Sequence, residues 1–349
     1  MNFPARYVVV SGPFSGGFGT THVCLDTNLN RKVVVKQITD KSQLKRLIDE
    51  IVALQTAKSK HVVQIYDVIV DNASGEIAFV EEFLPQDDLT NFHASGFTVS
   101  QYYSALYQIA CGLKDIHDCD IVHRDVKPNN MKRDQDHAIK LFDFGLAKVK
   151  PLPASTMVVI GTPGFMAPEL YTTKKIDKPI DVYAFGATAF YLGSGKLPPT
   201  AGAGLVPPKA LVAGESIANL VPAISASVAR RIDLALSLDS TCRPTMKEIC
   251  LALRRELLFE KHRAVVTDGV NLLVLDRTNK KVKAARGAAD AIEIAYDGYD
   301  FIVAAVSGHV EINNVVAIMG QILVGSYVVT LGAGGVRKFV TFDVSHPEV

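Results

Sequence analysis

The 349-residue sequence lacks an excess of charge of either sign. Its 37 Lys and Arg residues nearly balance its 36 Asp and Glu residues, which gives a formal net charge of +1. A protein that binds nucleic acid or an anionic membrane surface usually carries a concentrated positive field. The sequence therefore predicts neither a nucleic-acid partner nor a basic membrane-binding patch. It also lacks a charged N-terminal region followed by a long apolar run, so no signal peptide is expected.

Cysteine is sparse and irregularly spaced. The five cysteines form no Cys-x-x-Cys pair and no zinc-ligand spacing; they are Cys24, Cys111, Cys119, Cys242 and Cys250. An odd, scattered set is typical of a protein in a reducing compartment. We therefore expect a cytoplasmic location.

The sequence does contain a dense polar segment, HRDVKPNN, at residues 123–130, and a DFG triplet begins thirteen residues after its last Asn. Together they supply two carboxylates, one ammonium and one amide, at Asp125, Lys127, Asn130 and Asp143. Mg²⁺ prefers hard oxygen ligands and usually binds one or two carboxylates together with phosphates. This set of residue types indicates a site that holds a magnesium nucleotide beside a hydroxyl group.

The N-terminal part predicts strands around a glycine-rich turn. A β-branched run at residues 7–10 is followed by SGPFSGGFGTTHVCLD, and a second apolar run ends at Lys36. Glycines let a backbone approach phosphate groups closely, although a plain hairpin turn is the alternative for this segment. Next comes a helical apolar pattern that carries Glu50 on the same helix, with its apolar positions at Leu44, Leu47, Ile48, Ile51 and Leu54.

More elements follow in a fixed order. We expect strands at 61–70 and 77–82, a break at residues 83–85, and a helix from Val99 to His117 that leads into the polar segment. Three further motifs lie downstream: GTPGFMAPE at 161–169, DVYAFG at 181–186 and RPT at 243–245.

The order and spacing of these motifs resemble the serine/threonine branch of the eukaryotic-type (Hanks-type) protein kinase family, over residues 1–258. The resemblance implies an α+β, bilobal fold, with a β-rich N-lobe at residues 1–84 and a helical C-lobe at residues 85–258. It also implies ATP with Mg²⁺, or Mn²⁺, as cofactors and protein hydroxyl groups as substrates.

The resemblance implies a role for each matched residue. Asp125 would accept or orient the substrate hydroxyl, Lys127 would neutralise the γ-phosphate, and Asn130 and Asp143 would ligate the metal. Lys36 would hold the phosphates and be oriented by Glu50. The implied nucleotide-binding residues are Gly16, Gly17, Phe18, Gly19, Val34, Lys36, Glu82, Leu84 and Lys132.

Four positions depart from the family pattern. Phe14 replaces the first glycine of the loop, Val34 replaces an alanine, Lys132 replaces an apolar residue below the base, and Glu81 stands at the gatekeeper position. A buried Glu or Lys is costly unless it is paired. We expect Glu81 and Lys132 to pair with each other or with a neighbour. These departures keep a pseudokinase, a nucleotide-binding module without turnover, as the alternative function.

The loop before residue 161 offers regulatory positions. Ser155 and Thr156 are candidate phosphorylation sites, because a phosphate there would find a cation at Arg124. Thr162 is a third candidate, although a structural role, hydrogen-bonded to Asp125, is favoured for it.

Three other residues are expected to be structural. The resemblance implies a buried ion pair between Glu169 and Arg243, and a buried position for Asp181 at the start of a central helix. Removing one partner of a buried ion pair leaves an uncompensated charge.

The last part of the chain, residues 262–349, has a different composition. Runs rich in Val, Ile, Tyr and Phe alternate with turn signals, which predicts a small all-β sandwich or barrel, with residues 276–281 as a hairpin tip. Residues 312–336 contain no charge and are long enough to span a membrane as a helix, but their glycines and β-branched residues favour strands. We expect this β domain to sense, dock or regulate through a partner protein; a homodimer is left open.

Overall fold

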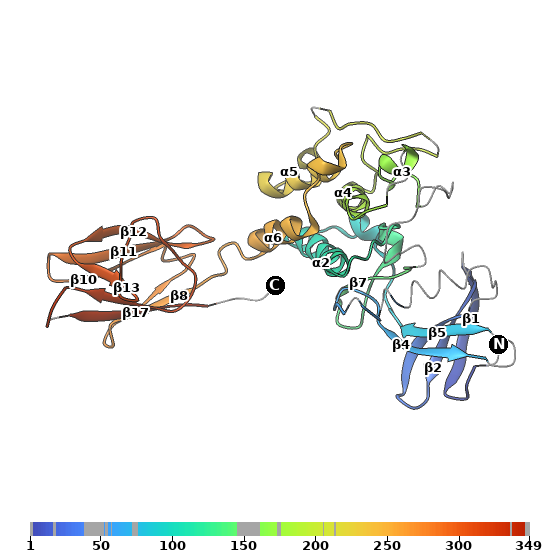
Figure 1. Ribbon diagram of the computed structural model, residues 1–349, viewed down its shortest axis with the longest axis horizontal. Helices are drawn as coiled ribbons and strands as arrows, with labels where there is room; N and C mark the ends of the chain where they lie inside the picture. Colours follow the sequence, from blue (N-terminus) through green and yellow to red (C-terminus); the bar gives the residue numbers. More distant parts are fainter. Residues whose placement is uncertain are drawn as a thin grey trace. The chain divides into compact units, whose positions relative to one another are not determined.

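The computed structural model describes residues 3–16, 19–37, 52, 55–56, 58–71, 76–144, 161–172, 176–204, 206–212, 214–335 and 337–345. The chain divides into two compact units, Met1–Leu253 and Arg254–Val349, which Figure 1 shows in different colours along the sequence. The first unit combines a β-sheet with helices, and the second follows the last turn of helix α6 (Met246–Leu257) with β-strands.

The first unit begins with a five-stranded antiparallel sheet in the order β1-β2-β3-β5-β4. Its strands are β1 (Tyr7–Gly16), β2 (Gly19–Asp26), β3 (Arg31–Gln37), β4 (Ile65–Val70) and β5 (Ile77–Glu82). Successive side chains of a strand point to opposite faces. One face buries Val33, Val35 and Val80 in an apolar cluster. Lys36 and Glu81 lie on the other face.

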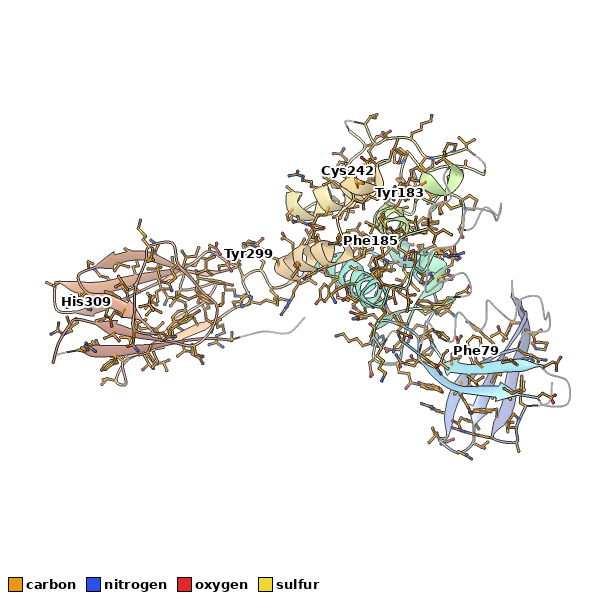
Figure 2. The ribbon with its side chains drawn as sticks, in the orientation of Figure 1. Phe79, Tyr183, Phe185, Cys242, Tyr299 and His309 are labelled. Atoms are coloured by element: carbon orange, nitrogen blue, oxygen red, sulfur yellow. The ribbon has the colours of Figure 1, made fainter. Side chains whose placement is uncertain are left out.

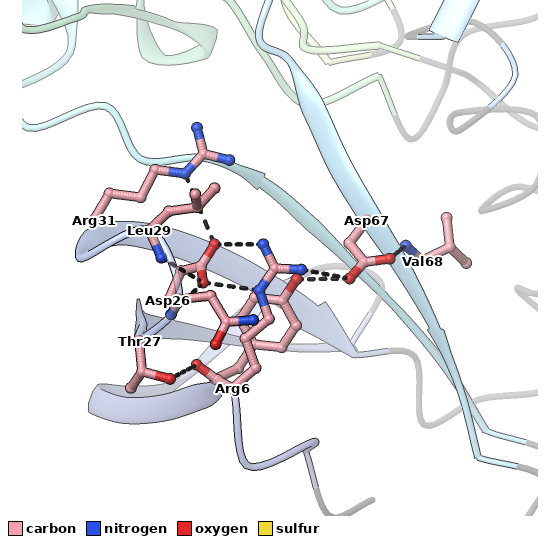
Figure 3. A network of polar contacts seen from close by, with 9 residues as sticks. Arg6, Asp26, Thr27, Leu29, Arg31, Asp67 and Val68 are labelled. Atoms are coloured by element: carbon pink, nitrogen blue, oxygen red, sulfur yellow. Dashed lines mark hydrogen bonds and ion pairs between the residues drawn. The ribbon is translucent and has the colours of Figure 1, made fainter.

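A network of charged side chains ties the edges of this sheet together (Figure 3). Arg6 donates two hydrogen bonds of 2.8 Å to the buried carboxylate of Asp26. Tyr7 donates to Asp67 over 2.6 Å, and Arg6 lies 3.7 Å from the same carboxylate. The network thus connects the start of β1 with the end of β2 and with β4.

The helical part of the unit is built around two long helices. Its elements are η2 (Leu89–Ser95), α2 (Val99–Asp118), η3 (Pro128–Asn130), α3 (Glu169–Thr172), α4 (Pro179–Ser194), η4 (Ile217–Asn219), α5 (Ala226–Ala235), η5 (Ser240–Cys242) and α6 (Met246–Leu257). Thr98 and Gln101 form a capping box that starts α2. Helix α4 is buried almost all round, and Figure 2 shows Tyr183 and Phe185 inside the helical part. It ends at Gly195, whose φ of 72° suits glycine.

A small two-stranded sheet carries the end of the polar segment. It consists of β6 (Met131–Arg133) and β7 (Ile139–Leu141), which follow η3 directly. The backbone of Val63, just before β4, is hydrogen-bonded to Leu141 over 2.9 Å, so this sheet adjoins the chain that leads into the N-terminal sheet.

The second unit is a pair of antiparallel sheets. Its strands are β8 (Ala264–Thr267), β9 (Leu272–Leu275), β10 (Lys281–Arg286), β11 (Asp290–Tyr296), β12 (Phe301–Ser307), β13 (Val310–Ile312), β14 (Val315–Val316), β15 (Ile322–Leu323), β16 (Tyr327–Leu331) and β17 (Lys338–Val344). One sheet has the order β14-β13-β16-β17-β8-β9 and the other β10-β11-β12-β15. Their common core is apolar and includes Phe301, Val303 and Phe342.

The all-β prediction for this unit is confirmed, but one turn within it was misread. Residues 276–281 were predicted to be a hairpin tip, yet they connect β9 in one sheet to β10 in the other. Asp276 does make a tight turn by accepting hydrogen bonds from the amides of Thr278 and Asn279. Turn chemistry specifies that the chain reverses, and not which sheet receives the next strand.

The charge-free run at 312–336 contains short strands separated by turns over the part that is described. It includes β14, β15 and β16. In the described residues of the whole chain, no helix combines the length and apolar character that crossing a membrane requires.

Candidate active site

The residues of the polar segment form a closed hydrogen-bonded group around Asp125. Its Oδ1 accepts a hydrogen bond of 2.7 Å from the hydroxyl of Thr162, and its Oδ2 accepts one of 3.0 Å from the amide of Asn130. The Lys127 Nζ lies 2.7 Å from Oδ2 and donates to Thr162 Oγ1 over 2.7 Å. Four predicted residues from two distant segments are therefore brought together, and Thr162 has the structural contact that was favoured for it.

This environment keeps Asp125 ionised. Burial alone would raise the pKa of its carboxyl, but the hydrogen bonds from Lys127 and Thr162 outweigh burial and hold the pKa below the ordinary value. An ionised carboxylate is an acceptor only. Asp125 can therefore accept a hydrogen bond from a hydroxyl group at neutral pH.

A second aspartate, Asp181, holds the backbone of the polar segment just before Asp125. Asp181, at the start of α4, accepts hydrogen bonds of 2.8 Å from the backbone amides of His123 and Arg124, and His117 Nε2 lies 2.9 Å from its Oδ2. Burial would raise the pKa of this carboxyl, but these partners lower it on balance. Arg124 and Asp143 have φ values of 71° and 66°, in the left-handed region. Asp181 thus satisfies backbone amides that the turned conformation leaves without helix or sheet partners.

The predicted phosphate lysine, Lys36, is engaged by the neighbouring strand. Its Nζ lies 3.1 Å from Oε1 of Glu81 and 5.5 Å from the ring centre of Phe79. Strand β5 pairs with β3 so that Val34 faces Glu81 and Lys36 faces Phe79. Glu81, which was expected to pair with Lys132 or a neighbour, is therefore paired with a neighbour, one diagonal step across the sheet.

Burial makes Glu81 an unusual carboxylate. Its side chain is 5% exposed. Burial raises its pKa, the ammonium of Lys36 opposes that effect, and the charge of Asp143 adds to it. Glu81, Lys36 and Asp143 are therefore close enough to interact electrostatically.

The other predicted nucleotide residues lie around the segment that follows β5. Glu82 forms an ion pair of 3.0 Å with Lys140 on β7, and Leu84 is buried. Lys132 on β6 forms a β-bridge with Asp88, and its ammonium lies 5.8 Å from the ring centre of Phe142.

The predicted structural pair lies in the helical part. Arg243 donates hydrogen bonds of 2.7 and 2.8 Å to the two carboxylate oxygens of Glu169 and also contacts backbone carbonyls of Ser237 and Pro179. The guanidinium is fully buried. Such a fork-to-fork pair joins the end of the 161–169 segment to the chain between η5 and α6.

Several predicted residues lie outside the described part of the chain. They are Gly17, Phe18, Glu50, Ser155 and Thr156. The backbone of Gly16 pairs with that of Gly19 at the turn between β1 and β2.

Two residues of this neighbourhood were missed by the sequence analysis. His117 contacts Asp181, and Lys140 contacts Glu82. Lys140 had a sequence signal, because it is the single charge between Ile139 and Leu141 on a strand that is otherwise apolar. His117 had none beyond its position at the end of a predicted helix.

The oxygen atoms of Asn130 and Asp143 suit a divalent cation whose other ligands are water and phosphate oxygens. Among the described residues no group of three or more His, Cys, Asp or Glu side chains could hold a metal. Asn130 uses its Nδ2 on Asp125, which leaves its amide oxygen for another ligand. One amide oxygen and the carboxylate of Asp143 suit Mg²⁺, which usually keeps waters and phosphate oxygens in its shell.

Comparison with known proteins agrees with this geometry. Residues 14–252 match the model of the protein kinase domain, which is more than half of the chain. A serine/threonine-protein kinase pkn2 from Myxococcus xanthus is 33% identical over 208 residues, covering 55% of this chain and 25% of that protein. A probable serine/threonine-protein kinase nek2 from Dictyostelium discoideum is 27% identical over 258 residues, covering 70% of this chain and 61% of that protein.

The chain therefore belongs to the protein kinase family. A probable serine/threonine-protein kinase zyg-1 from Caenorhabditis briggsae is 28% identical over 242 residues, covering 68% of this chain. The chain matches about a quarter of the first of these relatives and 32% of the zyg-1 protein. The family match ends at residue 252, before the second unit, Arg254–Val349, which we call the β unit.

Proposed function

We propose that the chain transfers the γ-phosphate of Mg-ATP to serine or threonine hydroxyls of protein substrates. The observation that carries this proposal is the group around Asp125, in which an ionised carboxylate is joined to Lys127, Asn130 and Thr162. Phosphoryl transfer needs alignment and charge neutralisation more than covalent chemistry from the protein. Membership of the kinase family supports the same reaction.

Each residue of the group has a task in this reaction. Asp125 accepts a hydrogen bond from the attacking hydroxyl and takes its proton, and Lys127 neutralises the transferred phosphoryl group. Asn130 and Asp143 would hold Mg²⁺, which offsets phosphate charge when it is bound. Thr162 keeps Asp125 and Lys127 in register through its hydroxyl.

The nucleotide is placed by the N-terminal sheet. Lys36 holds the α- and β-phosphates, with Glu50 as its proposed orienting residue. The turn formed by Gly16, Gly17, Phe18 and Gly19 covers the phosphates. The base lies between Val34 on one side and Lys132 on the other, next to the chain at Glu82 and Leu84.

The regulatory part of the proposal concerns the segment before residue 161 and the β unit. Ser155 and Thr156 are proposed autophosphorylation sites, and Thr162 is a structural residue. The β unit is proposed to bind a regulatory partner or a second copy of the chain. A reducing, cytoplasmic compartment is proposed from the five free cysteines.

Intact mass is the first test. The full chain is incubated with Mg-ATP and with casein as a protein acceptor, and the masses of both are measured. Gains in steps of one phosphate that are absent from Asp125→Ala would support the proposal. Asp136→Ala, at an exposed aspartate in the turn between β6 and β7, is the matched control and should behave as the wild type. Absence of any gain in the wild type would contradict the proposed activity.

A pseudokinase is the second candidate, because Lys36 is already engaged by Glu81. In that case the chain would bind nucleotide without transferring phosphate. Nucleotide binding with no mass gain on either protein would favour this candidate.

A further inference from the structure

The strand register fixes what surrounds Glu81. Along β5, Phe79 faces Lys36, Glu81 faces Val34, and the strand then runs through Glu82 into residues 83–85. In the proposed function the phosphates lie at Lys36 and the base lies near residues 83–85. A base held between these points has Glu81 beside its edge.

Glu81 brings to this place a hydrogen-bond acceptor that has no donor. Its Oε1 is paired with Lys36 over 3.1 Å. Its Oε2 is buried and has no hydrogen-bond partner among the described residues. Because a buried acceptor without a donor is costly, a ligand that supplies an N–H group at this point gains affinity.

We propose that Glu81 reads the base of the bound nucleotide: its Oε2 accepts a hydrogen bond from an exocyclic amino group of the base. This inference rests on the proposed function, which places the phosphates at Lys36. Adenine carries such an amino group at its six position, whereas guanine and hypoxanthine carry a carbonyl there. An ionised carboxylate can only accept, so it attracts the amino group and repels the carbonyl.

Lys36 keeps this arrangement compatible with catalysis. Its ammonium has three donors and can contact Glu81 and a phosphate oxygen at the same time. The Lys36–Glu81 pair also directs Oε1 towards the phosphate end of the site, which leaves Oε2 for the base. Glu81 therefore acts as a specificity-determining residue, and the transfer step stays with the group around Asp125.

The test compares ATP with ITP, which carries a carbonyl in place of the six-amino group. Both are used with Mg²⁺ to displace a fluorescent, ribose-labelled ADP from the full chain at pH 8. The high pH is chosen to favour the ionised form of Glu81, since burial raises the pKa of this carboxyl. We expect ATP to bind more tightly than ITP, and we expect Glu81→Gln to lower that preference by about tenfold, because an amide can also donate to a carbonyl.

Two further variants make the result interpretable. Glu81→Met removes the acceptor with little change in length and should also reduce the preference for ATP. Val34→Ala, on the facing residue of β3, is the matched control: it should change the binding of ATP and ITP by the same factor. Melting curves establish that each variant is folded, and Glu81→Met decides the matter if Glu81→Gln does not fold.

The outcomes separate this inference from the proposed function. A preference that stays within twofold of wild type in the Glu81 variants overturns base reading, whether or not phosphate is transferred. The predicted selectivity without any phosphate transfer supports base reading and contradicts the kinase activity. A wild-type chain that binds neither nucleotide overturns both.

Discussion

In the unit Met1–Leu253, some carboxylates lie fully buried against cations and backbone amides, whereas in the unit Arg254–Val349 three of the six aspartates cap turns. Asp181 is fully buried and Glu81 is nearly so. In the second unit, Asp268, Asp276 and Asp297 each accept hydrogen bonds from amides two or three residues further on. Such Asx turns are local and need no tertiary partner.

Both units have an apolar core, and the difference between them lies in their buried charged groups. The core of the second unit consists of apolar side chains from two sheets, including Phe301 and Phe342, whose ring centres are 5.7 Å apart. Burial of apolar surface stabilises a domain without fixing particular charges. Buried ionised groups, by contrast, are expensive and are retained where they position something.

The buried charges of the first unit are also not spread evenly. Asp181 holds the backbone beside Asp125, and Glu81 engages Lys36. The network of Arg6 and Asp26 in Figure 3 connects strands β1, β2 and β4 of the N-terminal sheet. Two of these three groups therefore serve the proposed active site, and the third serves the sheet that carries Lys36.

The largest expected effect is at Asp181. In Asp181→Asn one acceptor oxygen becomes an NH₂ group that faces a backbone N–H. We expect unfolding to become easier by about 3–5 kcal/mol, and phosphate transfer to fall by about 100-fold, because the turn before Asp125 is no longer held. Urea unfolding and a peptide-phosphorylation assay measure the two effects.

Asp290 offers the matched control for Asp181 in the second unit. It accepts hydrogen bonds from the amide of His309 and from Arg286 at the start of β11, where its side chain is 12% exposed. We expect Asp290→Asn to cost only about 1 kcal/mol and to leave phosphate transfer unchanged. Equal losses of unfolding free energy at Asp181 and Asp290 would show that the two units do not differ in how much a buried carboxylate contributes to stability.

A core substitution in the second unit tests whether the two units are stabilised separately. Phe342 is fully buried, and Phe342→Ala should cost about 3–5 kcal/mol within that unit. Nucleotide binding should be retained, because the residues proposed to bind nucleotide belong to the first unit. Calorimetry should show one transition moving to lower temperature while another stays in place. A single transition that shifts as a whole would contradict separate stabilisation.

Two ion pairs, one in each unit, allow the same comparison with smaller expected losses of unfolding free energy. Arg243→Met leaves the carboxylate of Glu169 without its fork of hydrogen bonds, and we expect a loss of about 3 kcal/mol. Lys280→Met removes a pair with Glu260 in the second unit, where both side chains are partly exposed, and should cost less than about 1 kcal/mol. Urea midpoints measure both; similar losses would argue that burial does not set the worth of these pairs.

Sequence reasoning predicted the elements that carry a strong local signal. The helix predicted at 99–117 is observed at Val99–Asp118, and the strand predicted at 77–82 is observed as Ile77–Glu82. The helix has a hydrophobic period and a capping box at its start, whereas the strand begins with a continuous apolar run of four residues. Residue types with obligatory chemistry, such as those around Asp125, could be named from their motif.

Partner choice could not be predicted, because it depends on register and topology. Glu81 was expected to pair with Lys132 or a neighbour, and only the facing of Val34 with Glu81 on paired strands puts Lys36 within reach. The turn at 276–281 was misassigned for a similar reason. Its side chains determine a reversal, whereas the sheet that accepts the next strand is determined by contacts far along the chain.

The smallest expected effect is a pH dependence at Glu81. Burial raises the pKa of this carboxyl above its ordinary value of 4.5, so the folded state binds its proton more tightly than the unfolded state does. Stability should therefore decline as the pH rises from about 4.5 through the folded-state pKa. Glu81→Gln has no proton to lose, so its melting temperature relative to wild type should increase between pH 5 and pH 8.

The sign of this change in relative melting temperature shows whether the buried charge of Glu81 stabilises or destabilises the first unit. Gln321→Ala, in the second unit, removes a side chain that does not titrate, so it serves as the control and should give the same melting-temperature difference at both pH values. If Glu81→Gln became relatively less stable as the pH rose, the attraction of Lys36 would outweigh burial at this site. Glu81 would then stabilise the fold as an ion-pair partner. The predicted direction would instead mark it as a charge kept at the expense of stability, in line with a residue retained for the nucleotide.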